Sequence, residues 1–135
     1  MADITAGAST TRRFTIDKER TISFMGEELR VYATPSMVLD IERTCRDFLN
    51  EHQKEGEDSV GARVEIDHLG PTLLGMWVDV TAKIAAVEGP RVTFEVEVKD
   101  ALDTVGRAKH IRFIVDKARQ KQRLEAKAAK AKAAG

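Results

Sequence analysis

Apolar positions three and four residues apart predict one long helix in the first half of the chain. At 100° per residue they lie within roughly 60° of Cys45, and they form a stripe of Val38, Ile41, Cys45, Phe48 and Leu49. Thr34 is a favourable N-cap residue, and Pro35 suits the first helical position because no amide donor is needed there. We therefore expect a helix that begins at Thr34 and ends near His52.

After residue 60 the pattern changes to alternating apolar and polar residues, which is typical of strands. The first expected strand, near residues 60–69, has one face that carries Ala62, Val64, Ile66 and His68. The second, residues 76–87, has an inward row of Met76, Val78, Val80, Ala82, Ile84 and Ala86. After a hairpin turn at residues 88–91, the third has an inward row of Val92, Phe94, Val96 and Val98. The last, residues 107–115, places Ala108, His110, Arg112 and Ile114 on one face.

Weaker patterns flank this region. Residues 20–25 alternate and predict a short strand before a turn at residues 26–29, whereas residues 1–11 are small and polar and are expected to be flexible. Residues 116–135 favour helix but have almost no apolar face, so we expect a solvated or fraying helix there. The folded domain is then residues 12–115. It has an α+β architecture in which an antiparallel sheet, with its last four strands in hairpin succession, wraps around one long central helix.

Composition and charge limit the class of protein. The 135 residues are 42% hydrophobic and 33% charged, which suits one modest folded core. The net charge is zero, but residues 116–135 carry +5 and residues 1–115 carry −5. A nucleic-acid-binding protein normally has its basic surface on the folded part, so we do not expect nucleic acid as a partner.

Cysteine use and targeting signals bear on location. Cys45 is the single cysteine and makes no intrachain disulfide, which suits a reducing compartment. The chain has no apolar run of signal-peptide length at its start and no stretch of the ~20 apolar residues that would span a bilayer. We expect a cytoplasmic protein without a membrane partner. Three histidines and one cysteine show no metal-ligand spacing, so no metal is expected.

Two polar residues interrupt the apolar patterns and are the first candidates for chemistry. Glu42 lies beside the helical stripe, and His68 lies on the apolar face of the first strand after the helix. A buried, unpaired carboxylate is costly, so Glu42 needs a hydrogen-bond partner, for which His68 is the nearest candidate. Simpler explanations stay open at this point. Glu42 can reach water at the core boundary, His68 can be structural, Thr34 can be only a helix cap, and Gly61 can be only a strand start.

Four stretches of the chain are similar to a known family. They read VYATPSMVLDIERTC, GEDSVGARVEIDHLGPT, VDVTAKIAAVEGPRVTFEVEVKDALD and GRAKHIRFIV, and they cover residues 31–115 in register. The chain resembles hotdog-fold acyl-CoA thioesterases, and in particular the fluoroacetyl-CoA thioesterase branch. The resemblance implies a helix enclosed by the sheet, a homodimer with sheets aligned edge to edge, and acyl-CoA sites at the dimer interface. It leaves a dimer of dimers open.

The resemblance also implies roles for individual residues. Thr34, Glu42 and His68 correspond to the triad of this branch, and the Gly61 amide corresponds to its oxyanion hole. Arg112 corresponds to an arginine that would pair with a CoA phosphate or brace the site. Met37 and Leu69 would contact the substrate in a tunnel whose depth sets the acyl length. Eight helical residues rise about 12 Å, so Thr34 and Glu42 cannot be direct neighbours. His68, water or a partner subunit must connect them.

The expected function is therefore hydrolysis of a small or medium acyl-CoA thioester, without a cofactor because CoA is part of the substrate. Glu28 and Leu29 stand where the fluoroacetyl-specialised enzyme has a phenylalanine ahead of its threonine, so fluoroacetyl preference is not implied. A non-catalytic acyl-CoA-binding protein is the main alternative. A hotdog dehydratase or hydratase is a weaker one, because His68 is followed by LGPT and the chain has no Asn-Pro motif.

Overall fold

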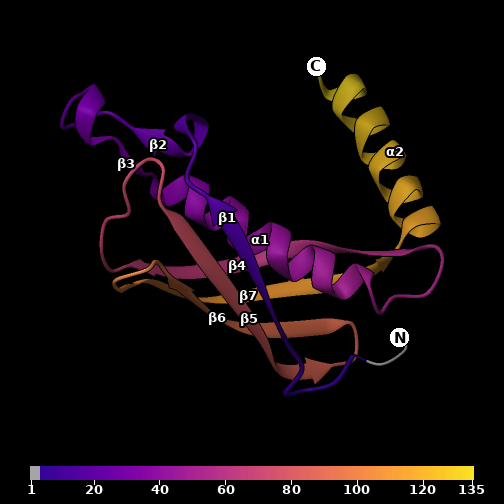
Figure 1. The fold of residues 1–135 in the computed structure, drawn as a ribbon. Coiled ribbons are helices and arrows are strands. Elements are labelled where there is room, and N and C mark those ends of the chain that lie inside the picture. The colour runs from indigo at the N-terminus through magenta and orange to yellow at the C-terminus, as the bar shows by residue number, and fades with distance from the viewer. Residues whose placement is uncertain (1–3) are drawn as a thin grey trace.

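A curved antiparallel sheet with one helix across its face positions every candidate residue (Figure 1). The computed structural model describes residues 4–135. The sheet has the strand order β1-β5-β6-β7-β4, so β1 and β4 form its two edges. Its strands are β1 (Ser9–Thr15), β4 (Glu57–His68), β5 (Trp77–Glu88), β6 (Arg91–Lys99) and β7 (Thr104–Asp116).

Helix α1 (Thr34–Asn50) lies along the concave face of this sheet, and its buried side chains form the core with the inward rows of the strands. The expected inward rows are confirmed over most of β5, β6 and β7, where Val78, Val80, Ile84, Phe94 and His110 are each at most 1% exposed. At the end of β5 the expectation was wrong, because a bulge between Ile84 and Ala86 places Val87, and not Ala86, against the core. The α+β hotdog architecture around a single central helix is therefore confirmed. Apolar burial on both layers supplies most of the driving force for this packing.

Three expectations about the sheet were wrong. Ser9–Thr11, expected to be flexible, belongs to β1 and pairs with β5, while residues 1–3 lie outside the described part. The strand expected at residues 20–25 is reduced to β2 (Thr21–Ile22), which pairs with β3 (Val31–Tyr32) in a separate two-stranded sheet. The last four strands are not in simple hairpin succession, because β4 crosses to the far edge and pairs with β7.

Short 3-10 turns, Lys18–Arg20 and Glu27–Leu29, flank β2, and the rest of the expected strand after Ile22 is a turn. The second of them coincides with the turn expected at residues 26–29. This small β2–β3 unit lies at the end of the molecule where α1 begins (Figure 1). It leads directly into Thr34.

Strand β4 contains a bulge that the alternating pattern did not predict. Gly61 pairs with Arg112 and Arg63 pairs with Ile111, so Ala62 is an extra residue on β4. A bulge of this kind bends the strand and re-aims the neighbouring side chains. Ala62 is exposed, and Gly61 faces the helix in its place, so the expected face of Ala62, Val64, Ile66 and His68 is wrong at its first member.

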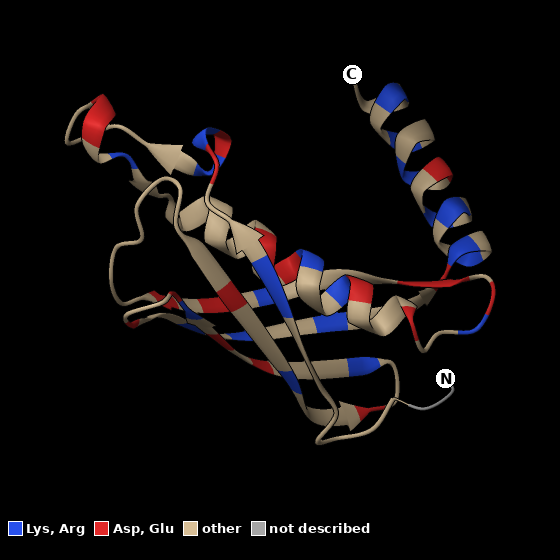
Figure 2. Ribbon diagram, in the orientation of Figure 1, with Lys and Arg blue, Asp and Glu red and all other residues tan. Residues whose placement is uncertain are grey.

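The C-terminal segment forms helix α2 (Lys117–Ala134), which has no buried residue and projects from the body (Figure 1). The helix expected in this basic tail is confirmed. Asp116 caps it by accepting hydrogen bonds from the amides of Ala118 and Arg119. Figure 2 shows Lys and Arg repeated along its length. Within residues 4–135, no helix has the length and apolar character needed to cross a membrane.

Candidate active site

Thr34 and His68 form a direct pair at the start of α1. Thr34 was expected to cap the helix, but Ala33 occupies the N-cap position and no side chain caps this end. The Thr34 hydroxyl instead lies 2.7 Å from Nδ1 of His68, at the end of β4. Pro35 follows in the first turn, as expected. The threonine side chain is thus used by the imidazole and not by the helix.

The environment of His68 favours its neutral form. Burial lowers the pKa of His68, against an opposing effect of the Gly70 backbone. The imidazole and the Tyr32 ring are packed in a T-shaped arrangement, with ring centroids 6.3 Å apart. A neutral His68 with Nδ1 unprotonated can accept a proton from the Thr34 hydroxyl.

Glu42 and Gly61 form a second cluster, two turns beyond Thr34 on α1 and seven residues before His68 on β4. A Cβ atom built on Gly61 would lie 2.8 Å from Oε2 of Glu42, so the helix carboxylate packs directly on the glycine backbone. Glu42 is neither buried nor free, since its side chain is 39% exposed and Oε2 lies 3.8 Å from Nη1 of Arg112. Glycine is needed here for close approach and not for an unusual backbone angle.

Arg112 braces this second cluster from β7. Its side chain is 5% exposed, and it donates from Nε to Ser59 Oγ at 2.8 Å and from Nη2 to the Ser59 carbonyl at 2.9 Å. Nε2 of His110, which is fully buried, lies 3.2 Å from Nη1 of Arg112. An arginine engaged in this way supports the bracing role over direct pairing with a CoA phosphate.

The two clusters lie apart within one chain. Glu42 was expected to pair with His68, but Glu42 faces Arg112 and His68 faces Thr34. Gly61 and His68 are seven residues apart on β4, which corresponds to about 23 Å along a strand. The chain therefore carries two half-sites: Thr34 with His68, and Glu42 with Gly61 and Arg112.

Open space adjoins the second half-site. A surface cavity of about 250 Å³ is lined by Leu39, Glu42, Arg43, Arg46 and Arg112. Glu42 is thus at the boundary between the helix and solvent-filled space. Cys45, one turn further on, is buried, and burial raises the pKa of its thiol to about 12, so it is not a candidate nucleophile.

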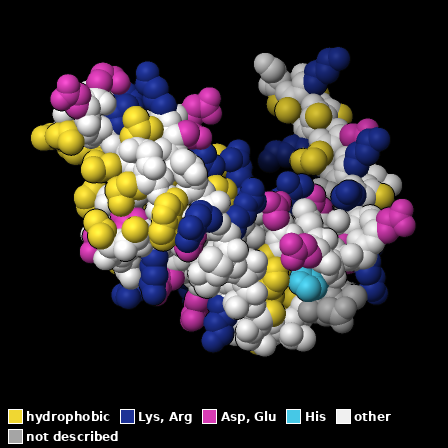
Figure 3. Space-filling view, in the orientation of Figure 1, with side chains coloured by type: hydrophobic (Ala, Val, Ile, Leu, Met, Phe, Trp, Pro, Cys, Tyr) yellow, Lys and Arg dark blue, Asp and Glu magenta, His cyan; other side chains and the backbone are white. Residues whose placement is uncertain are grey.

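Apolar side chains gather on the surface beside the first half-site, over β2 and β3 (Figure 3). The exposed members include Ile22, Phe24, Met25, Leu29, Leu69, Leu73 and Leu74. Leu73 forms a bridge with Val31, and the Leu74 amide donates to the Arg30 carbonyl, which joins the two contributing segments. Leu69 belongs to this surface, next to His68, whereas Met37 is fully buried and packs against Gly106.

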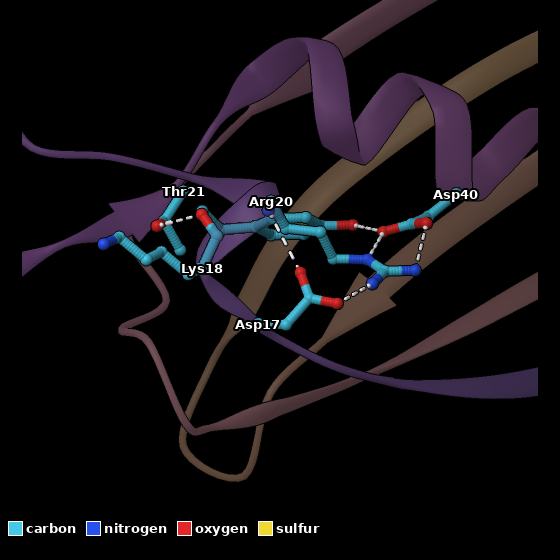
Figure 4. Close-up of polar contacts among 6 residues, drawn as sticks. Asp17, Lys18, Arg20, Thr21 and Asp40 are labelled. Atoms are coloured by element: carbon cyan, nitrogen blue, oxygen red, sulfur yellow. Dashed lines mark hydrogen bonds and ion pairs between the residues drawn. The ribbon is translucent and has the colours of Figure 1, made fainter.

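The helical pattern did not indicate Asp40, which at 1% exposed is the most buried carboxylate among residues 4–135. It accepts hydrogen bonds from the Tyr32 hydroxyl at 2.6 Å and from Nε of Arg20 at 2.9 Å, and Arg20 also pairs with Asp17 (Figure 4). Burial and Asp40 raise the pKa of Tyr32, which stays protonated as a donor. A helical stripe centred on Met37 and Ile41 would have placed Asp40 nearer the core than Glu42.

Comparisons with known proteins identify the class. The chain superposes with a TM-score of 0.89 on a Thermus thermophilus hypothetical protein that is a thioesterase superfamily member, at 31% identity over 98% of this chain and 99% of the other. A hot-dog-like protein from Thermanaerovibrio acidaminovorans, 22% identical, shares the fold with a TM-score of 0.83 over 90% of this chain and 91% of the other. The structure is therefore a hotdog fold of the thioesterase superfamily.

Within that class, the chain belongs to the fluoroacetyl-CoA-specific thioesterase family, whose profile matches residues 16–118. Fluoroacetyl-CoA thioesterase from Streptantibioticus cattleyicolor is 33% identical over 85 residues, which span 63% of this chain and 61% of that protein. A solved structure of fluoroacetyl-CoA thioesterase superposes with a TM-score of 0.83 at 26% identity, over 93% of this chain and 98% of the other.

Proposed function

We propose that the protein is an acyl-CoA thioesterase that hydrolyses a small or medium acyl-CoA to the acid and free CoA. The observation that carries the proposal is the 2.7 Å contact between the Thr34 hydroxyl and Nδ1 of a partly buried His68. The contact joins a hydroxyl to a base with a lowered pKa, and by resemblance both residues correspond to the reactive residues of this family.

In the proposed reaction, His68 acts as general base on the Thr34 hydroxyl or on a water that Thr34 positions. The base function requires the proton of His68 to reside on Nε2, so that Nδ1 can accept. The Gly61 amide stabilises the oxyanion that develops on the thioester carbonyl, a contribution of ~2.7–4 kcal/mol per donor in comparable sites. Glu42 orients the attacking group, and Arg112 fixes the carboxylate.

These roles need both half-sites, and a homodimer brings them together. Strand β4 is a 12-residue edge strand in the described chain, and long exposed edges are normally covered or paired. An antiparallel pairing of β4 with a second copy, centred on Glu65, would set Arg63 opposite Asp67 of the other copy, and the extra residue Ala62 would then bring Gly61 opposite His68. Opposed residues in such a pair share a face, and both residues face the helix layer.

Substrate and location complete the proposal. The exposed apolar surface beside His68 suits an acyl group or a second subunit. The S. cattleyicolor relative is named for fluoroacetyl-CoA. Glu28 and Leu29, near the tip of the β2–β3 unit, replace the aromatic residue that we associate with that preference, so we propose unsubstituted short or medium acyl groups. A buried, single Cys45 supports a reducing, cytoplasmic location.

The function is tested by measuring thiol release from acyl-CoAs of increasing chain length. We expect turnover with short and medium chains, and a fall of about 100-fold or more in kcat for His68→Ala and Glu42→Gln. No hydrolysis across the panel, or full activity in both variants, would overturn the proposal. A thermal shift with CoA esters but no thiol release would instead identify an acyl-CoA-binding protein.

A further inference from the structure

The bulge in β4 is held from the neighbouring strand by two buried side chains. We propose that His110 and Arg112 of β7 are positioning residues that clamp this bulge, so that the Gly61 backbone and the Glu42 carboxylate stay in register for the reaction. The proposal rests on the proposed thioesterase function for its catalytic consequence. The clamp itself is a statement about structure and is testable without turnover.

The contacts span both sides of the bulge. On one side, Arg112 holds Ser59 through its hydroxyl at 2.8 Å and its carbonyl at 2.9 Å. On the other side, Nδ1 of His110 lies 2.9 Å from the carbonyl oxygen of Arg63. The His110–Arg112 contact of 3.2 Å joins the two halves. A bulge interrupts the ladder between strands, so these side-chain bonds replace the constraint that backbone pairing would otherwise supply.

The protonation state of His110 follows from its partners. The Arg63 carbonyl can only accept, so Nδ1 of His110 must carry a proton. The Arg112 guanidinium can only donate, so Nε2 must be unprotonated. His110 is therefore neutral in the Nδ1–H form. Burial lowers its pKa, with Arg112 acting in the same direction and the Arg63 carbonyl and Glu42 opposing.

Both side chains end at the second half-site. The Cβ position of Gly61 lies 3.3 Å from Nη1 of Arg112 and 3.4 Å from Cε1 of His110. The same Nη1 atom faces Oε2 of Glu42 at 3.8 Å. The guanidinium therefore has one nitrogen shared between the clamp and the carboxylate. A shift of His110 moves the Glu42 environment without any contact between His110 and a substrate.

Variants of His110 separate the two halves of the clamp. His110→Asn retains a donor for the Arg63 carbonyl, His110→Gln retains an acceptor for Arg112, and His110→Leu retains neither. We expect kcat to fall at least tenfold in His110→Leu and less in the other two, with KM changed less than twofold in all three. Val80→Ala on β5 is a matched control, because it destabilises the buried core two strands away and should leave kcat unchanged below its melting temperature.

Two measurements do not depend on activity. Nitrogen-15 NMR of the imidazole should show the neutral Nδ1–H form of His110, and amide exchange at Gly61, Ala62 and Arg63 should accelerate in His110→Leu but not in Val80→Ala. A protonated His110 at neutral pH, unchanged exchange, or unchanged kcat in folded His110→Leu would overturn the clamp. Absence of hydrolysis in the wild type would overturn the proposed function alone, while the NMR and exchange results would still decide the clamp.

Discussion

At the scale of single residues, Gly61 has no room for a side chain beside Glu42. A methyl group on Gly61 would lie 2.8 Å from the carboxylate oxygen, and the end of a flexible side chain can move away. We therefore expect Gly61→Ala to fold with nearly unchanged melting temperature and to lose at least tenfold in kcat. If the effect acts through Glu42, the double variant Gly61→Ala/Glu42→Gln will be no slower than Glu42→Gln. Additive losses would contradict this coupling.

The buried carboxylate Asp40 is predicted to matter for stability. Asp40→Ala removes the acceptor of Tyr32 and of Arg20, and breaking a buried ion pair in this way typically costs ~3–5 kcal/mol. Asp47→Ala on the same helix is the control, because Asp47 is 55% exposed in its pair with Arg12 and should cost no more than ~1 kcal/mol. Urea unfolding of both variants measures the difference. Equal losses of unfolding free energy in the two variants would show that the buried Asp40 network stabilises the fold no more than an exposed ion pair does.

The lowered pKa of His68 gives a signed prediction for pH dependence. The general base must be neutral, so kcat/KM should rise with pH through the pKa of His68, and this limb should lie below the usual value near 6.5. An acid limb of the kcat/KM profile above pH 7 would contradict the proposed environment of His68.

The same pKa shifts predict how stability depends on pH. Burial also lowers the pKa of His110. The unfolded chain therefore takes up protons before the folded one as pH falls below about 6.5, and stability should decrease there.

At the scale of elements, the sequence pattern predicted the features that depend on neighbouring residues, namely which strand faces are buried and where the central helix begins. The inward rows of β5, up to Ile84, and of β6 were predicted because one face of each strand packs on the core, and α1 begins where Thr34 and Pro35 indicate. Strand β1 was missed because it is an edge strand whose side chains are mostly exposed and polar. The bulge at Ala62 and the crossing of β4 to the far edge depend on contacts with β7, which no short-range pattern contains.

The candidate residues were predicted by resemblance more than by pattern. Thr34, Glu42, Gly61 and His68 all lie at the two half-sites, but the expected Glu42–His68 pair is absent from the described residues. Distances along α1 and β4 determine that separation. The sequence indicated it only through the rise of about 12 Å that separates Thr34 from Glu42 on a helix. His110 and Asp40 are buried polar groups whose partners lie far away in sequence, so the sequence alone could not show their roles.

At the scale of the whole molecule, α2 is an appendage to the fold. It contributes no buried residue, and residues 116–135 carry a charge of +5 (Figure 2). We expect deletion of residues 118–135 to change the free energy of unfolding by less than about 0.5 kcal/mol, measured by urea unfolding, because no buried group is lost. A large loss would show that α2 packs against another surface, for example a second copy.

The central claim is that each active site combines Thr34 and His68 of one subunit with Glu42 and Gly61 of another. Coexpression of His68→Ala with Glu42→Gln tests it most directly. In a symmetric dimer with random pairing, half of the molecules contain both variants and regain one intact site, so the mixture should recover about one quarter of wild-type thioesterase activity. If each site is instead formed within one chain, the mixture will be as inactive as either variant alone, and the account fails.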